Sequence, residues 1–128
     1  ELLDVMQKHK ADFTNTFSLL SENTLPDVEL FKTEEFLFWY KKWKLRLEKE
    51  SKSFEDMRKV METNNPKIIP RNHLVERALK KAEEGELKTI KEYIKILQNP
   101  YGSQINIADE YFMPPNDNEK VLQTFCGT

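Results

Sequence analysis

The only cysteine of this 128-residue sequence, Cys126, lies in the C-terminal tetrapeptide FCGT. A cysteine can act as a nucleophile, a metal ligand or one half of a disulfide. Chain termini are the most exposed part of a domain, so a thiol there is open to exchange but is not thereby activated. One cysteine cannot form a disulfide within the chain. Cys126 is therefore a redox candidate, and a free thiol without a role is the alternative.

The other residues that could do chemistry stand without the partners that such chemistry needs. His9 and His73 are the only histidines, and neither has a second metal ligand at a spacing such as HxxxH or CxxC. The segment PNDNEK at 115–120 lacks the central glycine and closing glutamate of a calcium loop. Three isolated glycines cannot form a phosphate-binding loop. The sequence therefore shows no motif for a metal ion or a bound phosphate.

The segment NPKIIPRNHLVERAL, residues 65–79, places Arg71 and Asn72 at the expected start of a helix. Helix N-termini attract anions, so this pair could contact a phosphate or a substrate. Asparagine is also strongly preferred as a helix cap. We favour the structural interpretation, in which Asn72 caps the helix and Arg71 ties the loop to a neighbouring carboxylate.

The aromatic cluster FLFWYKKWK, residues 36–44, allows two interpretations. Aromatic rings among lysines can stack on single-stranded nucleic acid, and the segment YKKWKLR would then be the binding stripe. The rings recur at spacings of three and four, however, which is typical of a helix face that packs into a core. We favour the core, and we expect Trp39 and Trp43 to be buried.

The overall composition excludes several classes of partner. A net charge of −2 with 33% charged residues gives no basic excess for nucleic acid. No apolar run approaches the roughly 18 residues that a membrane span needs, and no signal segment opens the sequence. We expect a cytoplasmic protein if it is bacterial and a mitochondrial one if it is eukaryotic. Because apolar periodicity is already under way at Leu2, we expect a piece of a longer chain.

Abundant leucine, lysine and glutamate with only three glycines predict an all-α fold of about five to six helices. The expected helices cover residues 1–10 and 11–20 (two short helices or one bent helix, with Asp12 as N-cap), 33–50, 53–61, 73–85 and 86–99. The last two should form an antiparallel hairpin near 71–98, with Gly85 in the left-handed position that ends the first. Their facing stripes should include Leu74 and Ala78 on one side and Leu87, Ile90, Ile94 and Leu97 on the other.

Residues 99–128 carry turn residues and Pro114-Pro115 without periodicity. We therefore divide the chain into a helical domain at 1–98 and an irregular, extended C-terminal tail at 99–128. The simplest function for such a chain is an autonomous helical protein-interaction module, with no enzymatic role.

The order and spacing of several motifs resemble the C-terminal region of the selenoprotein O (YdiU) family. The pattern NPxxxxRNxL, the small-residue helix that ends in Gly-Glu, the NPY triplet and the FCGT end all match along nearly the whole chain. The matching residues are Asn65, Pro66, Arg71, Asn72 and Leu74, then Ala78, Ala82, Gly85 and Glu86, then Asn99, Pro100 and Tyr101.

This resemblance implies a function that periodicity cannot show. Family members have a kinase-like fold and are pseudokinases that transfer AMP from ATP to Ser, Thr or Tyr of other proteins (AMPylation, a nucleotidyltransferase activity). Their nucleotide- and Mg²⁺-binding residues lie ahead of this region, so we assign this sequence no catalytic, cofactor-binding or metal-binding residue. We expect a C-terminal helical part that supports the kinase-like domain of the same chain. The expected partners are that domain and protein substrates, with neither nucleic acid nor membrane.

The resemblance also bears on Cys126. Selenocysteine-containing members carry that residue third from the end, where this sequence has cysteine. Some members have a second cysteine two residues earlier, where this sequence has Thr124. The resemblance thus implies a redox role for Cys126 with a partner outside the 128 residues, by which the thiol could gate the catalytic domain. Asn65, Pro66, Arg71 and Asn72 are expected to form a structural motif.

Overall fold

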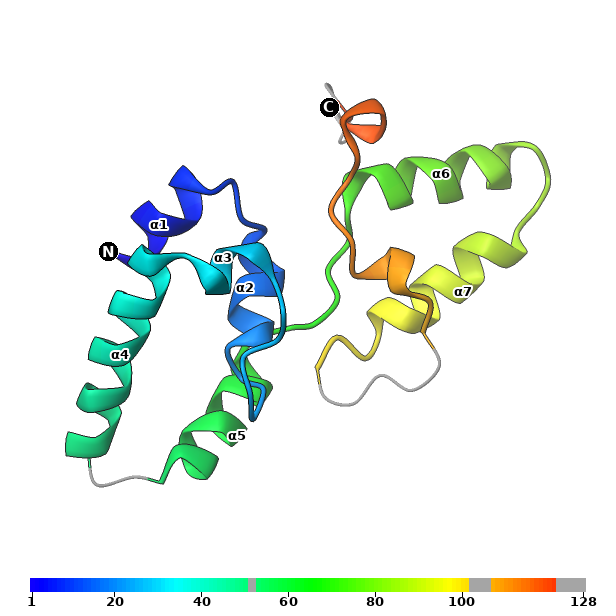
Figure 1. The fold of residues 1–128 in the computed structure, drawn as a ribbon. Helices are drawn as coiled ribbons and strands as arrows, with labels where there is room; N and C mark the ends of the chain where they lie inside the picture. Colours follow the sequence, from blue (N-terminus) through cyan, green and yellow to red (C-terminus); the bar gives the residue numbers. More distant parts are fainter. Residues whose placement is uncertain (51–52, 102–106, 122–128) are drawn as a thin grey trace, which may run out of the picture. The chain divides into compact units, whose positions relative to one another are not determined.

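The computed structural model describes residues 1–50, 53–101 and 107–121 of the chain. These residues form seven α-helices and two short 3-10 helices, and they contain no β-strand (Figure 1). The expected all-α fold is confirmed. In the part of the chain that is described, no helix is both long and apolar enough to cross a membrane.

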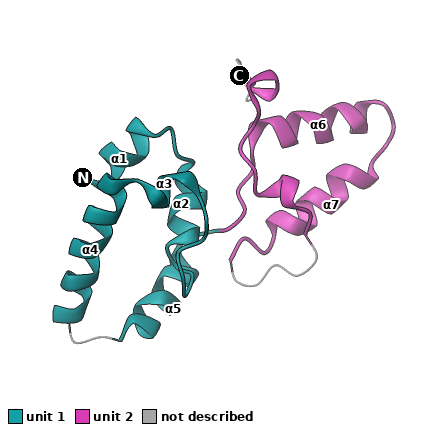
Figure 2. Cartoon of the chain, viewed as in Figure 1, with its two compact units in different colours: residues 1–66 teal, residues 67–128 magenta. Residues whose placement is uncertain are grey.

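The chain divides into two compact units, residues 1–66 and residues 67–128 (Figure 2). This division differs from the boundary at 98/99 that the loss of periodicity predicts. The difference arises because residues that follow the last helix pack back on it. The ring of Tyr111 stacks on Tyr93 with centroids 5.5 Å apart, so the described part of the tail belongs to the second unit.

Unit 1 contains α1 (Leu2–Lys8), α2 (Phe13–Leu19), α3 (Glu29–Lys32), α4 (Glu34–Lys49) and α5 (Phe54–Asn64). The first two are separate helices, because the chain turns at Lys10, whose φ is +51°. The predicted cap Asp12 accepts a hydrogen bond from the Asn15 N–H at 2.8 Å. Side chains also cap α4 and α5. The short α3 was not expected from the sequence.

The core of unit 1 centres on Phe36, which has no exposed surface. Its ring stacks on Phe31 at 4.4 Å and on Tyr40 at 5.9 Å. The prediction that Trp39 and Trp43 are buried is wrong in degree, since both are only half-buried. Trp39 packs against the edge of the core cluster, and Trp43 contacts Trp39, Tyr40 and Phe54 of α5.

Unit 2 contains α6 (Asn72–Glu83) and α7 (Lys88–Leu97), which pack on each other as the predicted hairpin (Figure 1). Gly85 lies between them with a φ of +91°, a conformation that an L side chain rarely adopts. Leu74 and Ala78 of α6 are buried, as expected.

The buried face of α7 differs from the predicted stripe. Leu87 and Ile94 are 51% and 50% exposed, whereas Tyr93 is only 4% exposed. A tyrosine can bury its ring while its hydroxyl takes part in a hydrogen bond, and here the hydroxyl meets the Arg71 N–H. Ile90 and Leu97 flank the buried cluster. Helix α7 therefore packs on α6 through the face that carries Tyr93, and not through the face that carries Ile94.

The described part of the tail is more regular than predicted. It forms two 3-10 helices, η1 (Asp109–Tyr111) and η2 (Asp117–Glu119). The second is held by a capping box between Asn116 and Glu119. Cys126 lies outside the described residues.

Candidate functional site

The first two residues of the NPxxxxRNxL motif, Asn65 and Pro66, lie at the C-terminal end of unit 1. Asn65 ends α5, and its Nδ2 donates a hydrogen bond to the Phe17 carbonyl at 3.2 Å. This bond ties the end of α5 to α2, which lies 48 positions earlier in the chain. Pro66 follows as the last residue of the unit.

The second half of the motif lies at the start of α6. Arg71 precedes the helix and is 7% exposed. Its backbone N–H donates to the Tyr93 hydroxyl at 3.0 Å, and its Nη2 donates to the Phe112 carbonyl at 3.0 Å. One residue thereby contacts both α7 and the chain that follows η1.

The prediction that Asn72 caps α6 is wrong. Arg71 occupies the cap position without a side-chain cap hydrogen bond, and Asn72 is the first residue of the helix and is exposed. The reason is that the Arg71 N–H bonds to Tyr93 from that position. The Arg71 side chain donates to the backbone carbonyl of Phe112, and its expected tie to a carboxylate stays a prediction.

Two tyrosines complete the surroundings of Arg71. Burial raises the pKa of Tyr93, and the hydrogen bond from the Arg71 N–H offsets part of that rise. Burial also raises the pKa of Tyr111. Both phenols therefore stay neutral at physiological pH, so Tyr93 serves as a hydrogen-bonding ring of the core.

An open groove of about 540 Å³ lies beside Arg71 and is lined by Ile69, Pro70, Asn72, His73, Pro115, Lys120 and Val121 as well. The His73 Nδ1 is buried and has no hydrogen-bond partner among the described residues. Burial lowers the pKa of His73, which the charge of Glu119 partly opposes and the charges of Arg71 and Arg77 reinforce. The imidazole is therefore neutral at neutral pH.

No three His, Cys, Asp or Glu side chains converge in the described part of the chain. The motif residues instead join backbone segments that are distant in sequence. Their assignment as a structural motif stays a prediction, as does the redox role of Cys126.

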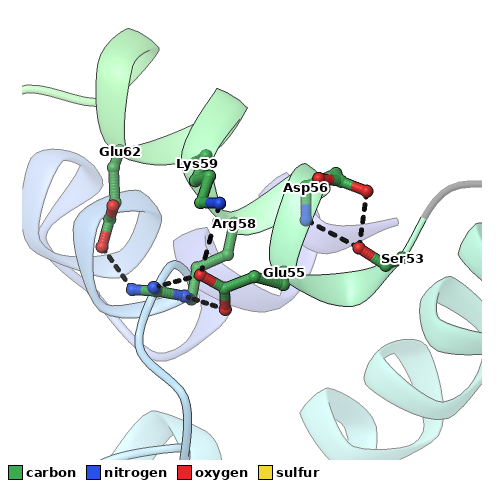
Figure 3. Close-up of polar contacts among 6 residues, drawn as sticks. All are labelled: Ser53, Glu55, Asp56, Arg58, Lys59 and Glu62. Carbon is green, nitrogen blue, oxygen red and sulfur yellow. Dashed lines mark hydrogen bonds and ion pairs between the residues drawn. The ribbon is translucent and has the colours of Figure 1, made fainter.

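A polar network on α5 was missed by the sequence analysis (Figure 3). Arg58 contacts Glu55 through two nitrogens, at 2.8 and 3.1 Å, and Glu62 at 2.6 Å. The hydrogen bonds from Arg58 lower the pKa of Glu55. Because these partners lie three and four residues apart on one helix, the network stabilises α5 locally. The ExxRxxxE spacing of the charges at residues 55–62 was the available signal.

His9 takes part in a second ion-pair cluster. Its Nε2 lies 2.9 Å from Glu35, which also contacts Lys8. Hydrogen bonds from Lys8 and His9 lower the pKa of Glu35. The cluster links α1 to the first turn of α4, so it is a structural contact between helices.

The described residues form an all-helical segment in which polar side chains link one helix to another. Asn65 links α5 to α2, Tyr93 links α7 to the start of α6, and Glu35 links α4 to α1. No family model matches the chain. The protein named protein nucleotidyltransferase YdiU from Bacillus mycoides is 45% identical over 129 residues, which covers 100% of this chain and 26% of that protein. Proteins of the same name from Clostridium perfringens and Bacillus anthracis are 44% and 43% identical, with 99% and 100% of this chain covered.

The resemblance found in the sequence is thereby confirmed. This chain is homologous along its whole length to the C-terminal part of the YdiU protein nucleotidyltransferases. It spans about a quarter of the length of these curated relatives.

Proposed function

We propose that this chain is the C-terminal helical part of a protein adenylyltransferase. The observation that carries the proposal is identity of 43–45%, over essentially the whole chain, to proteins named protein nucleotidyltransferase. In the proposed reaction, a Ser, Thr or Tyr hydroxyl oxygen of a protein substrate forms a bond to the α-phosphorus of ATP. Pyrophosphate leaves, and the hydroxyl proton passes to a base.

The proposal assigns the kinase-like domain, with its ATP and Mg²⁺, to the part of the parent protein that precedes this chain. The 128 residues then have a supporting role, which suits a segment whose buried arginine and tyrosine join distant stretches of backbone. The proposed partners are the kinase-like domain and the protein substrates. We place the parent protein in the cytoplasm, as a working assignment from its bacterial relatives.

Deleting the 128 residues from the parent protein tests this supporting role. We expect AMP transfer to fall by about tenfold or more, because small displacements of catalytic groups are costly. The control is the thermal unfolding transition of the shortened protein, which shows whether its remaining domain is folded. A folded shortened protein with unchanged AMP transfer would contradict the supporting role and favour an autonomous interaction module.

Cys126 is proposed as a thiol that gates the catalytic domain. Oxidation would join it by a disulfide to a cysteine in the preceding part of the parent protein, with two electrons and two protons passing to an oxidised thiol such as glutathione disulfide. A disulfide that closes a long loop restricts the conformations of the chain strongly.

We expect AMP transfer by the parent protein to differ between glutathione disulfide and dithiothreitol, and this difference to vanish in Cys126→Ser. Gel mobility without reductant reports the disulfide itself. Identical activity and mobility of the two proteins under both conditions would show that Cys126 is an ordinary thiol.

A further inference from the structure

An open groove lies between α1 and the first turns of α4. It has a volume of about 650 Å³ and is lined by Glu1, Asp4, Val5, Glu34, Glu35 and Phe38. We call it the α1–α4 groove. Phe38, which lines the groove, is 65% exposed. Leu3 of α1 and Leu37 of α4 do not line it and are 57% and 46% exposed. Large apolar side chains are thus uncovered on two well-formed helices.

Helix α4 carries more apolar surface than unit 1 uses. Phe36 is completely buried in the core, whereas its neighbours Leu37 and Phe38 remain exposed. Single exposed apolar residues are common, but a cluster rimmed by charges marks an interaction site. Among the described residues, the Nζ of Lys42 lies 5.4 Å from the centroid of the Phe38 ring, and most of the Phe38 side chain is still exposed.

The rim of the groove is acidic. Four of its six lining residues are carboxylates, and none is basic. Lys8 and His9 pair with Glu35, and Lys42 pairs with the carboxylate of Glu1. Glu34 has no ion pair with any residue in the described part of the chain. A partner that complements this groove offers an apolar side chain together with lysine or arginine.

We propose that the α1–α4 groove docks onto the preceding part of the same polypeptide, through an apolar residue that contacts Phe38 and a basic residue that pairs with Glu34. This inference rests on the proposed function, in which a kinase-like domain precedes the chain. The chain spans 26% of its relatives and matches their C-terminal part, so the remaining three quarters lead into Glu1.

Tethering favours this occupant over a separate protein. Glu1 itself lines the groove, so the polypeptide that enters unit 1 does so at the edge of the proposed docking surface. A covalently linked partner is present at a high effective concentration, so a modest apolar and ionic contact suffices to hold it.

Hydroxyl-radical footprinting of the full parent protein tests the docking. The oxidation rate of Phe38 is compared between the wild type and Glu34→Lys, in which a positive charge replaces the unpaired carboxylate. We expect Phe38 to be oxidised several-fold faster in Glu34→Lys. Glu48→Lys is the matched control, because Glu48 lies on the same helix outside the groove, and it should leave the Phe38 rate unchanged. Buried Phe36 should stay protected in all three proteins.

A fast Phe38 rate in the wild type, equal to that in Glu34→Lys, would overturn the inference. Protection that weakens on dilution would also overturn it, because a second copy of the protein would then be the occupant. A carbodiimide cross-link from Glu34 to a lysine ahead of Glu1 would identify the partner directly. The oxidation rate of Phe38 is measured independently of AMP transfer. If Phe38 is unprotected while the parent protein still transfers AMP, only the docking inference is rejected. If Phe38 is protected but no AMP is transferred, only the proposed activity is rejected.

Discussion

Replacement of Phe36 by alanine is expected to lower the free energy of unfolding of unit 1 by about 3–5 kcal/mol, the range for large aromatic residues in cores. The side chain is 0% exposed and its ring contacts three others, those of Phe31, Trp39 and Tyr40. Its removal loses the transfer free energy of the ring and leaves a cavity among rings that cannot close over it.

Urea unfolding followed by tryptophan fluorescence measures this loss, because both tryptophans of the sequence, Trp39 and Trp43, lie in unit 1. The matched control is Leu45→Ala on the same helix, at a side chain that is 50% exposed. It should change stability by less than about 0.5 kcal/mol. Equal effects of the two substitutions would show that Phe36 is not the centre of the core.

The second large effect is expected at Arg71. Replacement by alanine removes the hydrogen bond to the Phe112 carbonyl and leaves space beside the buried cluster of Leu74, Ala78 and Tyr93. The arginine makes a buried, charged hydrogen bond and its stem packs in the core, so we expect the free energy of unfolding of unit 2 to fall by about 2–3 kcal/mol. Lysine should not restore the loss, because it lacks the planar guanidinium.

Amide hydrogen exchange in α6 and α7 reads out this loss. The control is Arg77→Ala, since Arg77 is 42% exposed and pairs with Glu110 at 2.9 Å on the surface. Exposed pairs contribute about 0–1 kcal/mol, so exchange should be nearly unchanged. Equal acceleration by both substitutions would contradict a special role for Arg71.

The sequence predicted the elements whose signals are local. Asp12 precedes an apolar stripe and caps α2 as expected. Gly85 interrupts two periodic segments and adopts the left-handed conformation that ends α6. Both features depend on residues within one or two turns, so their physical causes are visible in short windows of sequence.

The features that the sequence missed depend on distant residues. Tyr93 rather than Ile94 faces the hairpin core because its hydroxyl meets the backbone of Arg71, 22 positions away. Periodicity weighs only apolar character, so it favoured the isoleucine. Trp43 is half-buried beside Phe54 of α5, and the pattern of α4 does not contain this contact with another helix.

The candidate site was predictable only in part. The resemblance to the YdiU family singled out the motif residues, and Arg71 and Asn72 do lie at the start of α6, as the sequence predicts. One acceptor for the Arg71 side chain is the backbone carbonyl of Phe112, 41 positions away. A carbonyl is present at every residue, so no side-chain pattern marks this partner.

AMP transfer with position-labelled ATP tests the central claim most directly. The parent protein and the isolated 128-residue chain are each incubated with an acceptor protein and with ATP labelled at either the α- or the γ-phosphate. The account predicts that the parent protein transfers the α-label and not the γ-label to the acceptor, and that the isolated chain transfers neither. Transfer of the γ-label by the parent protein, or of the α-label by the isolated chain, would contradict it.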